Sequence, residues 1–308
     1  MTEALETLKR IPLFAGIDAR DITCERLGGL TNRNYKIGAT GETYMLRIAG
    51  DGTEEYIDRA SEQINGPVAA RAGVNAEVLF FDATDGVQLT RFIDGAATMT
   101  PETFKDLGAV ARAGRALCQM HECGEMFASE FNIFQMMDDY LGILNAKGAW
   151  VPDGYADVQR EAESVRAVLA ARPAPLAPCH CDPLAENFLD TGERMYVVDW
   201  EYAGNNDPVW DLADLSVEAS FGPDQDTALL EAYFRGSPTA AQVGRMVLYK
   251  AMCDLLWTLW GALQVANDNP AEDFRAYAQG RFERCKALMA SAGFAIHLKV
   301  VESVTIIT

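Results

Sequence analysis

The pattern of the chain changes near residue 92, and this change constrains the fold more than any other feature. The first ninety of the 308 residues contain short β-branched or alternating stretches and one helical stretch. Gly66-Pro67 lies within that helical stretch and predicts a break or kink. The predicted strands are 22–27, 34–37, 43–48, 78–81 and 87–92, and the predicted helix is 54–72.

Beyond residue 95 the apolar residues recur mainly at helical spacing. The final segment, 297–308, is rich in β-branched residues, so we predict an added strand or a tail there. The sequence therefore predicts an α+β fold with a small antiparallel-sheet lobe and a larger, mainly helical lobe. The predicted helices are 102–121, 135–147, 154–171, 211–220, 224–235, 240–265 and 270–291.

A single connector, Phe92-Ile-Asp-Gly95, joins the two patterns. We predict an N-terminal lobe at 1–91, a hinge at 92–95 and a C-terminal lobe at 96–308. A length of 308 residues is sufficient for two lobes with a core each. Two lobes on one hinge imply a cleft, where ligand sites are preferentially found.

The charge balance restricts the partners. A formal charge of −19 argues against binding to nucleic acid or stable association with an anionic membrane, and an acidic surface favours a cationic small molecule. The seven cysteines form no C-x-x-C pair, and Cys179-His180-Cys181 offers poor geometry for zinc. With no secretory signal and no long apolar run, we expect free thiols and a cytoplasmic protein of undetermined oligomeric state.

One His, one Asn and several carboxylates mark the segment from Cys179 to Leu215 as a candidate site. Asp182 is followed by Asn187, and an apolar run, Met195–Val198, then leads to Asp199 and Glu201. Transfer of a phosphoryl group requires an oriented hydroxyl, oxygen ligands for Mg²⁺ and nearby cations. Asp and Asn are common in loops for conformational reasons, but this explains single positions better than the whole series. The series predicts that Asp182 accepts a hydroxyl proton and that Asn187 and Asp199 hold metal.

The same segment resembles the catalytic loop of the choline and ethanolamine kinases and of the related aminoglycoside phosphotransferases. These families carry H-x-D-x-x-x-x-N followed by a hydrophobic residue and D-[WF]-E, which here are His180 to Asn187 and Val198 to Glu201. The resemblance implies a two-lobed protein-kinase-like fold, with ATP and Mg²⁺ as cofactors. It also implies a structural role for His180 and places Cys181 where the families often have Asn or Gly.

The N-terminal lobe carries a second motif, Leu27-Gly-Gly-Leu-Thr-Asn-Arg-Asn-Tyr35, which resembles the nucleotide loop of bacterial choline kinases. Small residues and exposed backbone N–H groups allow phosphates to approach closely. By the resemblance, Arg47 neutralises phosphate charge, Glu62 is its helix partner and the hinge contacts adenine; a solvated Glu62 stays open as the alternative. The expected nucleotide-binding residues are Gly28, Gly29, Thr31, Asn32, Asn34, Arg47, Phe92 and Ile93.

Aromatic residues in the C-terminal half suggest the acceptor. Trp257 and Trp260 are three residues apart and therefore share a helix face, which is typical of a core but also of a cage for a quaternary ammonium. Their helix and Tyr277-Ala-Gln-Gly-Arg-Phe282 resemble the choline site of choline kinases. Tyr202 matches a third aromatic residue of that pocket.

Taken together, the motifs predict a kinase that uses ATP and Mg²⁺ to phosphorylate a small cationic amino alcohol, either choline or ethanolamine. Asp182, Arg47 and Glu62 form the catalytic set, and Tyr202, Trp257, Trp260 and Tyr277 surround the ammonium group. The sequence leaves open another amine-bearing alcohol, such as an aminoglycoside or thiamine. It also leaves open a pseudokinase without turnover.

Overall fold

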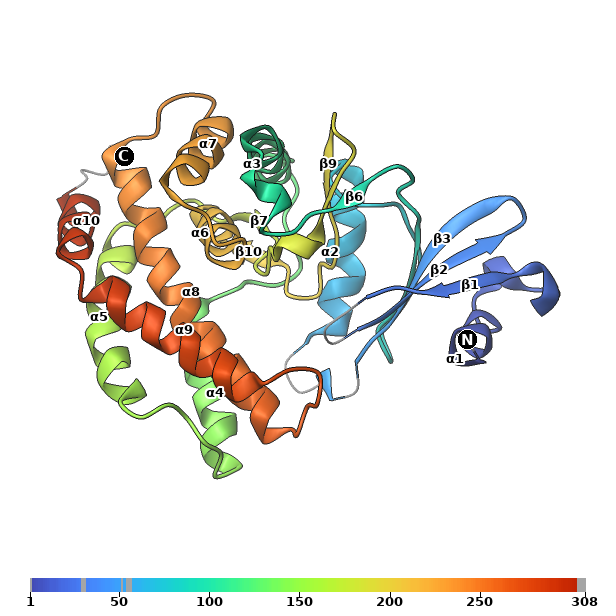
Figure 1. Cartoon of the computed structure of the whole chain (residues 1–308), viewed down its shortest axis with the longest axis horizontal. Coiled ribbons are helices and arrows are strands. Elements are labelled where there is room, and N and C mark those ends of the chain that lie inside the picture. Colours follow the sequence, from blue (N-terminus) through green and yellow to red (C-terminus); the bar gives the residue numbers. More distant parts are fainter. Residues whose placement is uncertain (1, 29–31, 51, 54–56, 304–308) are drawn as a thin grey trace.

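The chain folds into a smaller part built on a five-stranded antiparallel sheet and a larger, mainly helical part (Figure 1). The computed structural model describes residues 2–28, 32–50, 52–53 and 57–303. Sheet and helices therefore follow each other along the chain as the sequence pattern predicts, and the α+β class is confirmed.

The sheet has the strand order β1-β2-β3-β5-β4. Its central hairpin turns at Thr40 and Gly41, both with positive φ, which is the geometry of a two-residue type I′ turn. One helix that the sequence did not predict, α1 (Thr2–Leu8), packs Ala4 and Leu8 against the apolar side chains of the sheet. The strands are β1 (Thr23–Arg26), β2 (Arg33–Ala39), β3 (Glu42–Ile48), β4 (Val78–Asp82) and β5 (Val87–Arg91).

Helix α2 (Arg59–Arg71) runs through Gly66-Pro67 without interruption, so the predicted break is wrong. Asp58 caps its N-terminus by accepting hydrogen bonds from the backbone N–H groups of Ala60 and Ser61. Pro67 removes one backbone donor. The buried side chains of Val68 and Ala69 hold the next turn against the core, and tertiary packing therefore outweighs the local preference.

The helical part is centred on α8 (Ala240–Ala266), which is buried on every side from Ala251 to Gln264, as expected of a central helix. Helix α10 occupies residues for which we predicted a strand or tail; residues 304–308 lie outside the described chain. Its Phe294 and Val301 are buried, so packing decides its helical state. The other helices are α3 (Leu107–His121), α4 (Ile133–Ala146), α5 (Tyr155–Ala171), α6 (Val209–Glu218), α7 (Pro223–Phe234), α9 (Phe274–Met289) and α10 (Ala292–Ser303).

Two small sheets inside the helical part position the candidate site. Strand β8 (Phe188–Asp190) pairs with β9 (Met195–Val197), and the edge strand β6 (Ala97–Thr98) completes that sheet. Strand β7 (Ala177–Cys179) pairs with β10 (Gly204–Asn206). The chain from His180 to Asn187 and the chain from Val198 to Ala203 are therefore held side by side at the strand ends.

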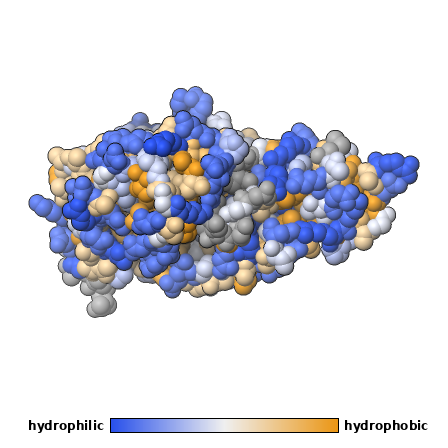
Figure 2. Space-filling view, turned by 90° about the horizontal axis from the view of Figure 1, so that it is seen from below, coloured by the Kyte–Doolittle hydropathy of each residue, from blue (hydrophilic) through white to orange (hydrophobic). Residues whose placement is uncertain are grey.

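Hydrophilic residues predominate on the face of the molecule seen in Figure 2, where hydrophobic residues form small separate groups. This agrees with the strongly acidic composition. Among the described residues, the helices are too short or too polar to cross a membrane.

Phe104 of the hydrophobic core is fully buried and makes edge contacts with Phe188 and Phe221, at 5.7 and 5.4 Å between ring centroids. We expect Phe104→Ala to lower the free energy of unfolding by about 3–5 kcal/mol, because it removes a large side chain and leaves a cavity. Urea denaturation measures the change. The nearby Leu107, 46% exposed, supplies the control Leu107→Ala, and similar losses in the two variants would contradict the prediction.

Candidate active site

Asp211 of α6 holds the backbone of the candidate catalytic loop. Its carboxylate accepts hydrogen bonds from the N–H groups of His180 at 2.7 Å and Cys181 at 2.8 Å. The same carboxylate is 2.9 Å from Nε2 of His121, whose Nδ1 contacts the Tyr233 hydroxyl. One buried carboxylate thus satisfies three groups and fixes the loop that ends at Asp182.

The His180 ring joins the two halves of the site. Its Nδ1 accepts a hydrogen bond from the Asp182 N–H at 3.3 Å, and its Nε2 therefore donates to the Val198 carbonyl at 2.9 Å. Burial lowers the pKa of His180, which agrees with a neutral ring. The contacts place Asp182 and Asp199 at the two ends of one short bridge, and they agree with a structural role for His180.

Two residues of the site have left-handed backbone conformations, Cys181 with φ +69° and Asp199 with φ +73°. Asn and Gly adopt this conformation more readily than Cys does. Such conformations persist where the surrounding contacts hold them. At Cys181 these contacts include the N–H bond to Asp211 and the carbonyl bond from the Trp210 indole.

Asp182 is half-buried and lies among other carboxylates. Burial, then the charges of Glu218, Asp199 and Glu201, raise the pKa of Asp182 well above its usual range. The Asn187 amide nitrogen donates to the Asp182 carbonyl at 3.0 Å. An acid group with a raised pKa at the meeting point of several segments is suited to proton transfer.

Arg47 of β3 reaches from the sheet to the segment that follows β9 in the helical part. Its guanidinium is buried, pairs with Glu62 of α2 and donates to Asp199 at 2.9 Å. Burial by itself would lower the pKa of Arg47, but the charges of Glu62, Asp199 and Glu201 raise it. Glu62 is fully buried, so the alternative of a solvated helix residue is wrong.

Only some of the other residues predicted to bind the nucleotide lie near this cluster. Asn32 is buried, and its amide nitrogen is 3.4 Å from Asp199 Oδ2. Asn34 donates to the Gly28 carbonyl at 3.2 Å, which closes the base of the loop. Gly29 and Thr31 lie outside the described residues. In the predicted hinge, the Phe92 N–H donates to the Thr43 carbonyl and continues the sheet, whereas Ile93 is half-buried.

Asn187 and Asp199 each offer side-chain oxygens of the kind that binds magnesium. The hydrogen bond of Asn187 to Asp182 engages its amide nitrogen and not its amide oxygen. Asp199 is half-buried, and one of its carboxylate oxygens lies within 4.8 Å of one carboxylate oxygen of Glu62 and one of Glu201. Carboxylate and amide oxygens are the ligands that Mg²⁺ prefers.

The predicted aromatic residues assemble in two pairs along α8. Tyr202 and Trp257 meet edge to face at 5.4 Å, and Trp260 and Tyr277 meet at 5.6 Å. The Trp257 indole donates to Asp214 Oδ1 at 3.2 Å, which fixes the ring. The structure therefore brings together residues from three distant segments of the chain.

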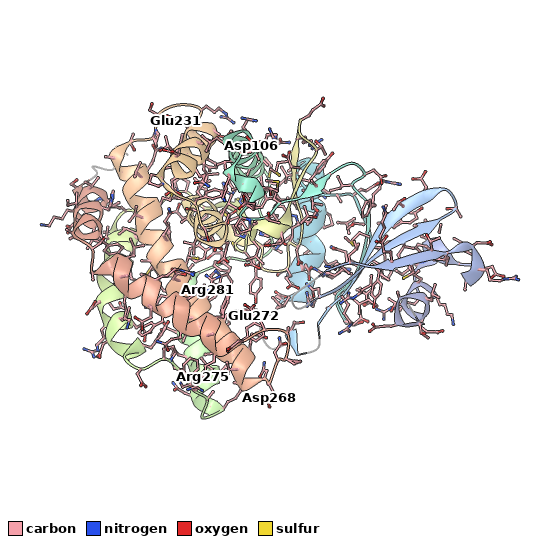
Figure 3. The ribbon with its side chains drawn as sticks, viewed as in Figure 1. Asp106, Glu231, Asp268, Glu272, Arg275 and Arg281 are labelled. Carbon is pink, nitrogen blue, oxygen red and sulfur yellow. The ribbon has the colours of Figure 1, made fainter. Side chains whose placement is uncertain are left out.

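Acidic residues of α6 that the sequence analysis missed border these aromatics. Asp214 is fully buried, and Glu218 accepts hydrogen bonds from Arg281 of α9 at 2.6 Å. Arg281 lies where α9 crosses α8, with its guanidinium 4.5 Å from the centre of the Tyr277 ring (Figure 3). Asp211, Asp214 and Glu218 have the spacing i, i+3, i+7 of one helix face, a signal that was available in the sequence.

Asp254 differs from its expected state. A helix carboxylate is ordinarily solvated, but Asp254 is buried and pairs with Arg281 and Arg284. Buried carboxylates require such partners. The sequence could not show them, because the two arginines lie on α9.

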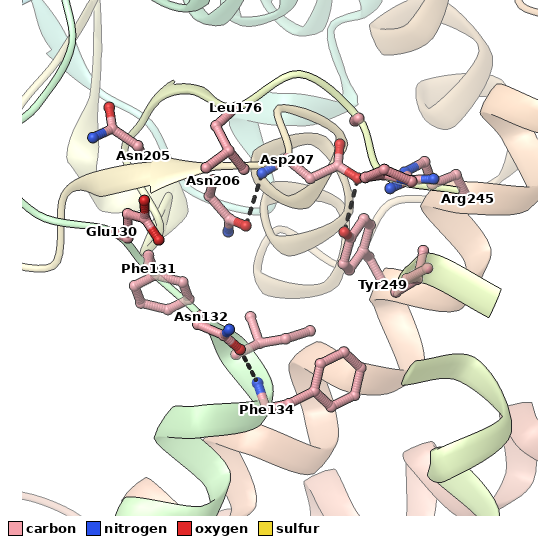
Figure 4. Close-up of a pocket in the computed structure, with 14 residues that line it drawn as sticks. Glu130, Phe131, Asn132, Phe134, Leu176, Asn205, Asn206, Asp207, Arg245 and Tyr249 are labelled. Atoms are coloured by element: carbon pink, nitrogen blue, oxygen red, sulfur yellow. Dashed lines mark hydrogen bonds and ion pairs between the residues drawn. The ribbon is translucent and has the colours of Figure 1, made fainter. Parts of the chain in front are cut away.

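A separate cavity of about 230 Å³ lies behind the loop, between α4, α5, α8 and the end of β10 (Figure 4). Its wall includes Asp207, which pairs with Arg245 and accepts a hydrogen bond from the Tyr249 hydroxyl at 2.8 Å. None of the predicted site residues that the structure describes lines this cavity. We therefore place the candidate active site around Asp182 and not here.

Comparisons with known proteins agree with this geometry. The model of the phosphotransferase enzyme family matches residues 23–245. A choline/ethanolamine kinase family protein from Mesorhizobium loti is 54% identical, covers 98% of each chain and has a TM-score of 0.88. Choline kinase LicA from Streptococcus pneumoniae is 26% identical over 93% of this chain and 99% of that one, with a TM-score of 0.79. A structure of LicA in complex with AMP, also 26% identical, covers 92% of this chain and 97% of that one, with a TM-score of 0.74.

Asp211→Ala tests the bracing of the loop. The substitution leaves the buried N–H groups of His180 and Cys181 without their acceptor, and each such group costs about 1–3 kcal/mol. We expect the free energy of unfolding to fall by more than about 2 kcal/mol, as measured by urea denaturation. Asp157→Ala, which removes an exposed carboxylate from α5, is the control. A loss no larger than that of the control would rule out the bracing role.

Proposed function

We propose that this chain, which belongs to the phosphotransferase enzyme family and within it to the choline/ethanolamine kinase family, transfers a phosphoryl group from ATP to the hydroxyl of choline or ethanolamine. The family confirms the resemblance drawn from the motifs and makes the chain a small-molecule kinase. The acceptor and the use of ATP are our proposal, supported by the named activity of LicA and by its complex with AMP.

The position of Asp182 carries the proposal. The charges that act on its carboxyl come from Glu218, beside the aromatic residues, and from Asp199 and Glu201, beside Arg47. Asp182 therefore lies between a group of aromatic and acidic side chains and a group of phosphate-binding and metal-binding candidates. A hydroxyl bound next to Asp182 would be oriented by its carboxylate, which would accept the proton as the bond to phosphorus forms.

The chain supplies the remaining functions from both of its parts. Arg47, oriented by Glu62, would contact phosphate oxygens through its planar guanidinium. Asn187 and Asp199 would hold Mg²⁺, which would supply positive charge to neutralise the phosphates. We also propose that residues 92–95 act as the hinge between lobes at 1–91 and 96–308, with Phe92 and Ile93 beside the adenine, and that Gly28, Gly29, Thr31, Asn32 and Asn34 contact the phosphates.

The aromatic and acidic group suits a cationic alcohol. Aromatic faces attract an ammonium ion, and the negative charge of Glu218 acts close to Tyr277. Arg281 neutralises part of that charge and fixes Glu218. Aminoglycosides and thiamine are also amine-bearing alcohols and therefore belong among the compounds to be tested. The pseudokinase alternative lacks support from the site, since Arg47, Asp182, Asn187 and Asp199 are all present.

An ADP-release assay tests the reaction with choline, ethanolamine, their methylated intermediates, thiamine and an aminoglycoside. We expect stimulation by choline or ethanolamine, and a decrease in kcat of about 10²- to 10⁴-fold in Asp182→Asn, because the amide cannot accept the proton. Thermal unfolding of the variant controls for its folding. Full activity of Asp182→Asn, or no stimulation by any alcohol, would refute the proposal.

Trp257→Ala and Trp260→Ala test the ammonium site. Loss of one aromatic face is expected to raise the KM for choline by about 3- to 30-fold, which corresponds to about 0.7–2 kcal/mol of cation–π attraction. The KM for ATP should stay constant. Trp150→Ala, which removes an indole stacked with Arg275 outside this group, is the matched control. An unchanged KM for choline in both α8 variants would contradict the assignment.

A further inference from the structure

A second arginine, Arg59, accompanies Arg47 in the contact between the two parts of the molecule. It is the first residue of α2 and is 9% exposed. Its Nη1 donates to Glu62 Oε2 at 2.6 Å and to Glu201 Oε2 at 2.9 Å, and its Nη2 donates to the Thr53 hydroxyl at 2.7 Å. One guanidinium therefore ties α2 and the chain before it to the segment that carries Asp199.

The two arginines divide the carboxylates between them. Arg47 pairs with Glu62 Oε1 and Asp199, and Arg59 pairs with Glu62 Oε2 and Glu201. Glu201 Oε2 is also within reach of Arg47, at 3.9 Å from its Nη1, but Arg59 is an ångström closer. Arg59 therefore keeps the Glu201 carboxylate from becoming a closer partner of Arg47.

Because the two arginines and their carboxylate partners are buried, each charge depends on its ion pair. The side chains of Arg47, Arg59, Glu62 and Glu201 are all less than one-tenth exposed. A buried carboxylate that loses its partner retains its desolvation penalty and is drawn to the next cation. Without Arg59, the next cation for Glu201 is Arg47, whose guanidinium would then be engaged by three carboxylates.

We propose that Arg59 is a positioning residue that holds Glu201 and so prevents a third carboxylate from competing with the phosphates of the nucleotide for Arg47. The proposal rests on the nucleotide part of the proposed function and is independent of the acceptor alcohol. It predicts that the effect of losing Arg59 is transmitted through the charge of Glu201. A residue that merely stabilised α2 would not have this dependence.

The test measures the affinity for ADP by isothermal titration calorimetry in EDTA, so that neither metal nor acceptor contributes. Arg59→Met is expected to raise the Kd by about tenfold, because Glu201 then competes with phosphate for Arg47. The double variant Arg59→Met/Glu201→Gln, which removes the competing charge, should return the Kd to within about twofold of that of Glu201→Gln alone. If removal of the Glu201 charge restores the affinity for ADP, the loss of Arg59 acts through Glu201. A variant that was only destabilised would not recover its affinity in this way.

Arg71→Met is the matched control, since Arg71 lies in the last turn of the same helix and forms an exposed pair with Glu125. Its Kd should equal that of the natural chain. If Arg59→Met does not fold, as judged by its melting curve, Arg59→Lys serves in the same cycle, because one ammonium group cannot reproduce the paired contacts.

Two results would overturn the inference while the natural chain binds ADP. One is an unchanged Kd in a folded Arg59 variant, and the other is a double variant as weak as the single one. Failure of the natural chain itself to bind ADP would instead overturn the proposed function, and this inference with it.

Discussion

The structure depends on one buried ionic cluster, in which Arg47 and Arg59 face Glu62, Asp199 and Glu201. Two carboxylates come from the segment after β9, and the other three side chains come from β3 and α2. Buried charges are tolerated only when they are paired, so the cluster favours a close approach of the two parts. The contact from the Asn65 amide of α2 to the Ala203 carbonyl, at 2.8 Å, reinforces this approach.

The candidate catalytic loop obeys a second constraint, imposed from within the helical part. Asp211 accepts hydrogen bonds from the N–H groups of two consecutive loop residues. The His180 ring is hydrogen-bonded both to the Asp182 N–H and to the Val198 carbonyl. These bonds hold Cys181 and Asp199 in left-handed conformations, which neither residue would favour in an isolated peptide. Asp182 is therefore placed by the backbone contacts of its neighbours.

The proposed acceptor side of the candidate site is assembled from α6, α8 and α9. Each helix contributes to one network, in which Asp214 orients Trp257, Arg281 binds Glu218, and the Arg281 guanidinium lies over Tyr277. Aromatic rings that are held by charged partners present defined faces to a ligand. The arrangement supports a small cationic alcohol as the acceptor and explains why residues far apart in the chain share one role.

The sequence by itself determined the succession of strands and helices and the family motifs, because periodicity and spacing are local properties of the chain. The pairing of Arg47 with Glu62 was implied only by the resemblance to the choline kinases, and the tertiary structure brings the two side chains together. The sequence did not determine the course of α2 through Pro67, the helical state of Ala292–Ser303, or the burial of Asp254. Nor did it identify Arg59, Asp214, Glu218 and Arg281 as members of the ionic and aromatic networks. Only the tertiary structure decided these features, because each depends on a partner that folding brings from a distant segment. A charged side chain can be buried only where such a partner compensates for its lost hydration.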